Sequence, residues 1–249
     1  MITVIAIAYL SSLILSVPSA LPNYEAFFSS ASQSFSLEDC SLTFQDSKSA
    51  LSYVFLSTTT GKVSVSSLNA LPLTIGNCPL ISLDGSNVAG TFTSMIVEDI
   101  FSETNSVLFE EANGASFSII DSPLSVNASS QTKSSSTKSM QIISSNSAKI
   151  LKLTNNMMNR FRGIGENGGA VECTLGRDCS LKVVGGLISG SESKGGNVGG
   201  LWVEMKEESS FTVGNMTDTD QVNAITSNDV SDLFQLVDCK AKRNTYGEH

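Results

Sequence analysis

Short runs in which apolar and polar residues alternate limit most strongly what this chain can fold into. The alternation has a period of two in segments 62–66, 171–175, 201–206 and 210–213. Such a period, carried by short runs rich in β-branched and aromatic residues, predicts strands with one buried face. Turn-forming pairs such as Asp84-Gly85 separate the runs, and no convincing amphipathic helix follows residue 20. The sequence therefore predicts an all-β protein.

A weak internal repeat predicts how these strands are arranged. Gly168 and Gly199 begin similar segments, and Ser180 and Ser210 begin similar strands at nearly the same interval along the chain. Repeats of about 20 to 50 residues made of short strands indicate a solenoid or a propeller. One coil cannot bury its apolar face alone, whereas stacked coils share a core and pair their backbone groups. We therefore predict a β-solenoid, a right-handed parallel β-helix, with glycines at its corners.

Three segments resemble the polymorphic outer-membrane protein repeats. Gly168-Gly169-Ala170-Val171 matches the family's GGA-plus-aliphatic motif, and Gly199-Gly200-Leu201 is a degenerate copy. The segment 211–215 is one residue longer than the family's Phe-x-x-Asn motif, and 238–247 resembles segments of protist surface proteins with pectin-lyase-like β-helices. The resemblance covers residues 160–249. It implies a right-handed parallel β-helix and an exported, adhesin-like surface protein, and it identifies no active site.

The amino-terminal segment predicts export. Residues 2–17 are uncharged and mostly apolar, and Val17-Pro18-Ser19-Ala20 presents small residues suited to cleavage after Ala20. The run is shorter than the roughly 20 residues that span a bilayer. Two alternatives stay open: a buried strand or helix at the start of the domain, and an uncleaved anchor. We assign 1–20 to a signal peptide and 21–249 to a β-helix domain with a Ser-rich excursion near 122–147.

Composition and sequons bear on the partners. Asn127 and Asn215 stand in N-x-S/T sequons and are candidate glycosylation sites, typical of a secreted or cell-surface protein. The net charge of -9 argues against a nucleic-acid partner, because phosphate contacts need a basic face. The expected partners are glycans or surface proteins. We expect membrane attachment only through a carboxy-terminal anchor outside this segment.

Five cysteines and one histidine limit the metal and redox chemistry. Cys173 and Cys179 are close enough in sequence to bridge a short turn and are the disulfide candidates, and the odd cysteine count leaves at least one thiol over. His249 is the sole histidine, so we expect neither a histidine metal site nor a well-positioned Ser-His-Asp triad. We expect no cofactor and no metal.

The sequence contains no evident motif that supplies the catalytic residues of known β-helix enzymes. A glycosidase needs two carboxylates around one groove, and Asp218 with Asp220 are better explained as surface turn residues. A calcium-dependent lyase needs an acidic cluster near a base, and Arg177 beside Asp178 indicates only a turn. The GxGxxG spacing at 163–168 lacks the strand-to-helix context of a dinucleotide site. We predict no catalytic residue.

The function expected from these observations is non-catalytic. A structural or adhesive β-helix module would meet glycans or proteins through flat Ser/Thr-rich faces. Trp202 would point outward, either as a contact residue or covered by a loop. The alternative is a carbohydrate-active enzyme, a polysaccharide lyase or glycoside hydrolase, on the same scaffold. An enzyme would bring two acids and a base into one groove. No polar cap follows the last strand, so a fragment, a truncated chain or cover by another chain stay open.

Export predicts the amino terminus of the mature protein. The secreted form should begin at Leu21, because signal peptidase is expected to cut after Ala20. Amino-terminal sequencing of the secreted protein tests this, and a mature form that retains Met1 would contradict cleavage.

Overall fold

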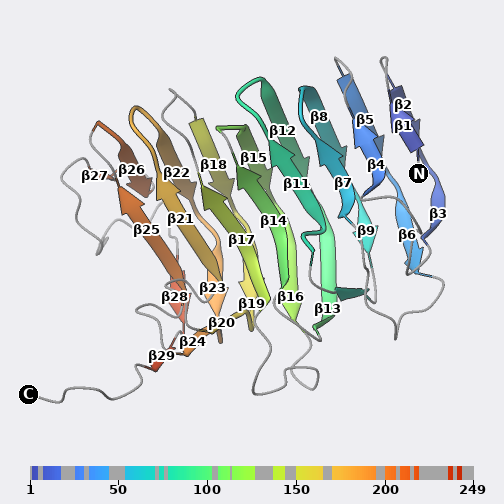
Figure 1. Ribbon diagram of the computed structural model, residues 1–249. Helices are drawn as coiled ribbons and strands as arrows, with labels where there is room; N and C mark the ends of the chain where they lie inside the picture. Colours follow the sequence, from blue (N-terminus) through green and yellow to red (C-terminus); the bar gives the residue numbers. More distant parts are fainter. Residues whose placement is uncertain are drawn as a thin grey trace, which may run out of the picture.

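The described part of the computed structural model consists of strands joined by turns. It comprises residues 2–4, 8–17, 26–30, 34–44, 54–70, 73–75, 78–102, 106–112, 114–126, 137–143, 150–164, 170–194, 200–205, 208–213, 216–218, 235–237 and 240–242. These residues form 29 strands in three sheets, which we name A, B and C. In Figure 1 the strands lie side by side from β1–β3 near the N label to β25–β29 near the C label.

Each sheet collects one strand from successive coils. Sheet A contains β1 (Ile2–Val4), β4 (Ala26–Ser30), β7 (Val54–Thr58), β11 (Ile81–Asp84), β14 (Ser106–Ala112), β17 (Thr137–Ile143), β20 (Arg162–Ile164), β21 (Val171–Leu175), β24 (Glu192–Lys194), β25 (Leu201–Met205) and β29 (Lys240–Lys242). Sheet B contains β2 (Ala8–Ser11), β5 (Ser34–Glu38), β8 (Gly61–Ser66), β12 (Val88–Thr93), β15 (Ser116–Ile120), β18 (Ile150–Thr154), β22 (Ser180–Val184), β26 (Ser210–Val213) and β27 (Met216–Asp218). Sheet C contains β3 (Ile14–Val17), β6 (Ser41–Phe44), β9 (Asn69–Ala70), β10 (Leu73–Ile75), β13 (Ile96–Ser102), β16 (Pro123–Val126), β19 (Met157–Asn159), β23 (Leu187–Ser189) and β28 (Gln235–Val237).

The strands pair in parallel between coils, which is the topology of a β-solenoid. Among the described strands, only the pairs β17–β20 and β26–β27 are antiparallel. Most coils visit sheet A, then B, then C before the chain returns to A. This confirms the predicted fold class: the protein is all-β, with the stacked parallel sheets of a right-handed parallel β-helix.

The register between coils explains why the repeat is weak in the sequence. Phe35 pairs with Val63, and Val63 pairs in turn with Gly90 after a slightly shorter interval along the chain. Leu181 pairs with Phe211 at a longer interval, the one that the repeat predicted. The coil length therefore varies, and no single period can align all coils.

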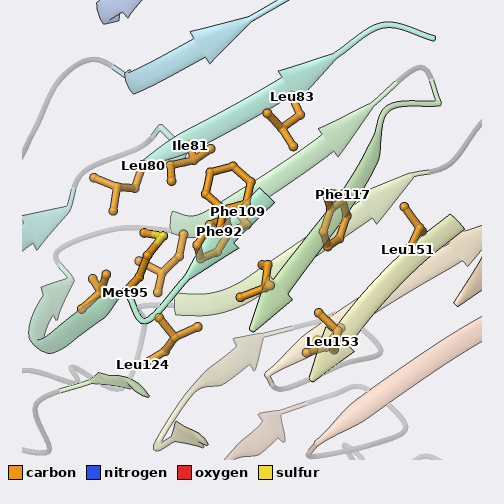
Figure 2. Close-up of a cluster of buried hydrophobic side chains, with 14 of the residues drawn as sticks. Leu80, Ile81, Leu83, Phe92, Met95, Phe109, Phe117, Leu124, Leu151 and Leu153 are labelled. Atoms are coloured by element: carbon orange, nitrogen blue, oxygen red, sulfur yellow. The ribbon is translucent and has the colours of Figure 1, made fainter. Parts of the chain in front are cut away.

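The core is a stack of inward-facing columns. In β8 the buried residues Val63 and Val65 alternate with outward residues, and β21 has the same alternation. Figure 2 shows how side chains from successive coils meet inside the solenoid, with Phe92 against Phe109 at a ring-centroid distance of 5.4 Å. Fully burying a side chain such as Phe or Leu stabilises the fold by about 1.5–3 kcal/mol.

The corner between sheets B and C repeats one backbone conformation in seven coils of the described chain. The corner residues have φ between 49° and 59° and are Ser12, Asp39, Ser67, Ser94, Asp121, Asn155 and Gly185. In six of them the N–H donates to a carbonyl oxygen of the next coil, for example from Asp39 to Ser66 at 3.1 Å. Asp and Asn enter this left-handed region more readily than most residues. The expectation of glycine corners therefore holds here only at Gly185.

A polar network lies inside this corner. The Ser122 N–H donates to Asn156 Oδ1 at 3.1 Å, and Asn156 Nδ2 donates to the Ile119 carbonyl at 2.8 Å. The Met95 N–H donates to Ser122 Oγ at 3.2 Å. Ser122 and Asn156 are both buried, so these bonds replace the water that the polar atoms lose on folding.

Residues 2–4 and 8–17 form strands of the first coil of the solenoid. Strands β1, β2 and β3 pair with β4, β5 and β6, and Leu10 and Leu15 pack against the core. This arrangement matches one alternative to the signal peptide, in which the amino-terminal segment is a strand at the start of the domain. Cleavage after Ala20 stays a prediction, because the folded chain does not test processing.

The Ser-rich stretch near 122–147 contains two strands of the solenoid. Residues 123–126 form β16 in sheet C, and 137–143 form β17 in sheet A. The Ser-rich centre at 127–136 lies outside the described residues. Over the described part of the chain, no helix is long and apolar enough to cross a membrane.

Gly90 generates a prediction about packing. A Cβ atom there would lie 2.7 Å from Phe92 Cε2 and 2.9 Å from Leu83 Cδ1. Gly90→Val should lower the free energy of unfolding by about 1–3 kcal/mol through overpacking. The control Ala89→Val faces outward on the same strand and should change it by less than about 0.5 kcal/mol. Urea unfolding measures both, and equal midpoints for the two variants would contradict the inward placement.

Candidate functional site

The outward face of sheet B carries an aligned column of hydroxyl and ammonium side chains. We name it the hydroxyl ladder; from coil to coil it contains Ser36, Ser64, Thr91, Ser118, Lys152, Lys182 and Thr212. Adjacent members sit on strands about 4.8 Å apart. The column is outward because the residues on either side of each member, such as Val63 and Val65 around Ser64, are buried in the core.

A second outward column lies two residues further along the same strands. It contains Ser66, Thr93, Ile120, Thr154 and Val184, all half-buried. Two residues along a strand span about 6.6–6.8 Å, so the two columns form a regular grid. Hydroxyl groups alternate with methyl-bearing side chains in this grid, and both kinds of group are presented to solvent.

An aromatic residue stands at the amino-terminal end of the ladder. Tyr9 pairs in register with Ser36, and its side chain is 60% exposed. The Tyr9 hydroxyl donates a hydrogen bond to the Glu38 carboxylate, and this bond raises the pKa of Tyr9 above its ordinary value of 10.0. The contact joins the first coil to the second coil at this face.

The outward face of sheet A carries carboxylates in its later coils. Glu110 and Glu172 each pair with Gln141, and Glu172 pairs on its other side with Trp202. Trp202 alternates with buried Val203, as expected, and it is half-buried. Glu204 lies two residues beyond Trp202 and is exposed. This arrangement places Trp202 in register with the carboxylate-bearing Glu172 on the neighbouring strand.

Two small voids lie among the side chains of the described coils. One void of about 10 Å³ is lined by residues that include Leu153, Met158 and Ile188. A second void of about 10 Å³ lies near Leu83 and Phe117. Each could hold about one water molecule at most. Neither of these two voids could hold a sugar.

The structure describes three of the acids and bases considered from the sequence, namely Arg177, Asp178 and Asp218. Arg177 and Asp178 form a turn, as predicted, and Arg177 Nε lies 3.5 Å from Glu208 Oε2 of the next coil. Asp218 lies in β27, whereas Asp220 is outside the described residues. Within the described residues, no group of three or more His, Cys, Asp or Glu side chains could hold a metal ion. His249 and the sequon residues Asn127 and Asn215 lie outside the described residues.

One ion pair could not be found from the sequence. Arg162 Nε lies 2.5 Å from Glu192 Oε1, and the two side chains are only 14% and 18% exposed. The two residues are far apart in the sequence and meet because β20 pairs with β24 in register. Strand β29 continues this pairing, with Lys240 in register with Glu192.

The disulfide candidates are present as thiols in the structure. Cys173 faces inward from β21 and Cys179 precedes β22, and both are buried. The Cys179 N–H donates to the Gly176 carbonyl oxygen at 3.2 Å and closes the turn between the two strands. A bond between the two sulfur atoms stays a prediction. Cys40 is buried as well, whereas Cys78 is half-buried, and burial raises the pKa of the Cys78 thiol to about 11.

Comparison with protein-family models, with curated proteins and with solved structures finds no match to this chain. The resemblance to polymorphic outer-membrane protein repeats therefore stays an expectation drawn from the motifs alone.

The raised pKa of the Cys78 thiol predicts that this residue is alkylated slowly. A pKa of about 11 leaves little thiolate at pH 8, so iodoacetamide should label Cys78 at least tenfold more slowly in the folded protein than in urea. The raised pKa also makes the stability of the fold depend on pH. The contribution of the neutral Cys78 thiol to the free energy of unfolding is fully present below pH 9.0, and it is lost as the pH rises toward 11.

Mass spectrometry of the Cys78 peptide separates its labelling from that of the other cysteines. Cys78→Ser is the control and should remove this part of the stability loss at alkaline pH. Equal labelling rates in folded and unfolded protein would contradict the burial of the thiol.

Proposed function

We propose that this protein is an exported, non-catalytic surface module that binds extended glycans along the hydroxyl ladder of sheet B. The observation that carries the proposal is the register-aligned grid of outward hydroxyl groups, which continues over successive coils. The uncharged segment 2–17, the two sequons and the motif resemblance support the exported location. The protein would act at the cell surface or after secretion.

The chemistry of the grid suits a polysaccharide. Hydroxyl groups both donate and accept hydrogen bonds, and sugars offer the same groups in return. The coil spacing of about 4.8 Å is similar to the length of one sugar ring, so a chain along the solenoid axis could repeat its contacts. Methyl groups of Ile120, Thr154 and Val184 would pack against the apolar faces of the rings.

Affinity on such a face has to come from many weak contacts. One hydrogen bond contributes about 0.5–1.5 kcal/mol net, so a single sugar would bind poorly to an open sheet. Repeated contacts along one polymer add through effective concentration, which favours long glycans over short ones. This dependence on length is the property expected of an adhesive or structural module.

The alternative is a carbohydrate-active enzyme on the same scaffold. The observation that favours it is the pair of outward carboxylates, Glu110 and Glu172, near Trp202 on sheet A. No Arg or Lys stands in the described part of this column. A hydrolase would release new reducing ends from its glycan, and a lyase would release unsaturated products.

The proposal predicts the effect of removing two hydroxyl groups. Ser64→Val combined with Thr91→Val should weaken binding to a long neutral polysaccharide about 30-fold, because two hydrogen bonds of about 1 kcal/mol each are lost. Valine favours strands, so the sheet should persist. Retention on immobilised polysaccharides, followed by titration with the one retained most, measures the change.

The matched control is Ser57→Val with Ser82→Val, an adjacent outward pair on sheet A. This variant should bind as the wild type does. Equal weakening by both double variants, or no retention of the wild-type chain on any polysaccharide, would overturn the proposal. New reducing ends or unsaturated products after incubation would favour the enzyme.

A further inference from the structure

Two lysines stand side by side in the hydroxyl ladder. Lys152 of β18 pairs in register with Lys182 of β22, and both side chains are exposed. Like charges directly opposite each other on adjacent strands destabilise a sheet. A chain with 15 basic residues against 24 acidic ones has placed two of its lysines where they repel each other.

The surroundings of the pair on this face carry no acid among the described residues. In the ladder the two lysines are flanked by Ser118 and Thr212, and Thr154 and Val184 lie beside them in the second column. Hydroxyl groups therefore surround the two ammonium groups along the column.

Several described acids of these and the adjacent coils lie at corners and turns, whereas Glu172 and Glu192 lie in β21 and β24 of sheet A. Asp121 occupies the corner after β15, and Asp178 and Glu208 occupy the turns before β22 and β26. Glu208 is already paired with Arg177. No ion pair joins either lysine to another described residue.

We propose that Lys152 and Lys182 form an anion subsite in the hydroxyl ladder, which binds the sulfate or carboxylate groups of an acidic polysaccharide. The inference rests on the proposed function, since it names the class of glycan that this face takes. An anionic group between the two ammonium groups accepts charge-assisted hydrogen bonds from both, and it removes their mutual repulsion.

The surrounding hydroxyls complete the recognition of a glycan rather than of a nucleic acid. Ser118, Thr154 and Thr212 can bond the neutral hydroxyl groups of sugars on either side of the anionic group. A nucleic acid needs several phosphate contacts, and the net charge of -9 opposes a densely charged partner. A polysaccharide that carries one anionic group every few sugars would place a single anionic group at the single lysine pair.

Three polymers with one backbone test the inference: dextran, carboxymethyl dextran and dextran sulfate. The full chain should bind one or both charged polymers at least tenfold more tightly than dextran, and added salt should weaken that preference. Lys152→Gln and Lys182→Gln, made singly, should each reduce the preference several-fold, and the double variant should abolish it.

Lys62→Gln is the matched control. Lys62 is exposed on the same face, and its register neighbours are Ser34 and Ala89 rather than a lysine. The Lys62→Gln substitution removes one positive charge, as the Lys152 and Lys182 variants do, and it should leave the preference for charged polymers unchanged. The thermal midpoints of the Lys152 and Lys182 variants should be no lower than that of the wild type, because repulsion is relieved.

The outcomes separate this inference from the proposed function. An equal loss of preference in Lys62→Gln would assign the effect to net charge and overturn the subsite, and so would tight dextran binding without any charge preference. Loss of charged-polymer binding in the lysine variants but not in Ser64→Val with Thr91→Val would support the subsite and overturn the neutral ladder. No binding of any polymer would overturn both.

Discussion

Backbone hydrogen bonds between parallel coils are the interaction on which the structure depends. Each strand satisfies its N–H and C=O groups with strands of the coils before and after it, so the strand spacing is set at about 4.8 Å throughout. The same bonds hold equivalent positions of successive coils in register, as in the pairs Phe35–Val63 and Leu181–Phe211. Apolar side chains therefore stack into continuous columns inside the solenoid, and polar side chains stack into columns outside it.

The register also explains where polar groups can be buried. Ser122 and Asn156 lie on successive coils at the inner side of one corner, and each satisfies backbone groups of a neighbouring coil. Arg162 and Glu192 meet in the same way, with two largely buried charges compensating each other. In both cases residues separated by one coil of chain become partners because the coils stack directly on one another.

A solenoid of this kind offers faces rather than pockets. The interior is filled by side chains, and the two voids described are no larger than about one water molecule. The faces differ in chemistry: the ladder of sheet B contains hydroxyls and lysines, whereas the outward column of sheet A contains serines in earlier coils and carboxylates with Trp202 in later ones. An extended polymer that follows the solenoid axis fits the regular spacing of such a face better than a compact ligand does.

The sequence by itself determined the all-β class, because period-two alternation and frequent turn residues leave a chain no other way to bury its apolar side chains. It also indicated the solenoid, since segments such as those beginning at Ser180 and Ser210 recur at the length of one coil. Only the tertiary structure decided which residues of different coils become neighbours. The lysine pair, the ion pair between Arg162 and Glu192, and the Ser and Asp corners all depend on register. The coil length changes along the chain, as the pairs Val63–Gly90 and Phe117–Leu151 show, and this variation hides the register from any fixed period.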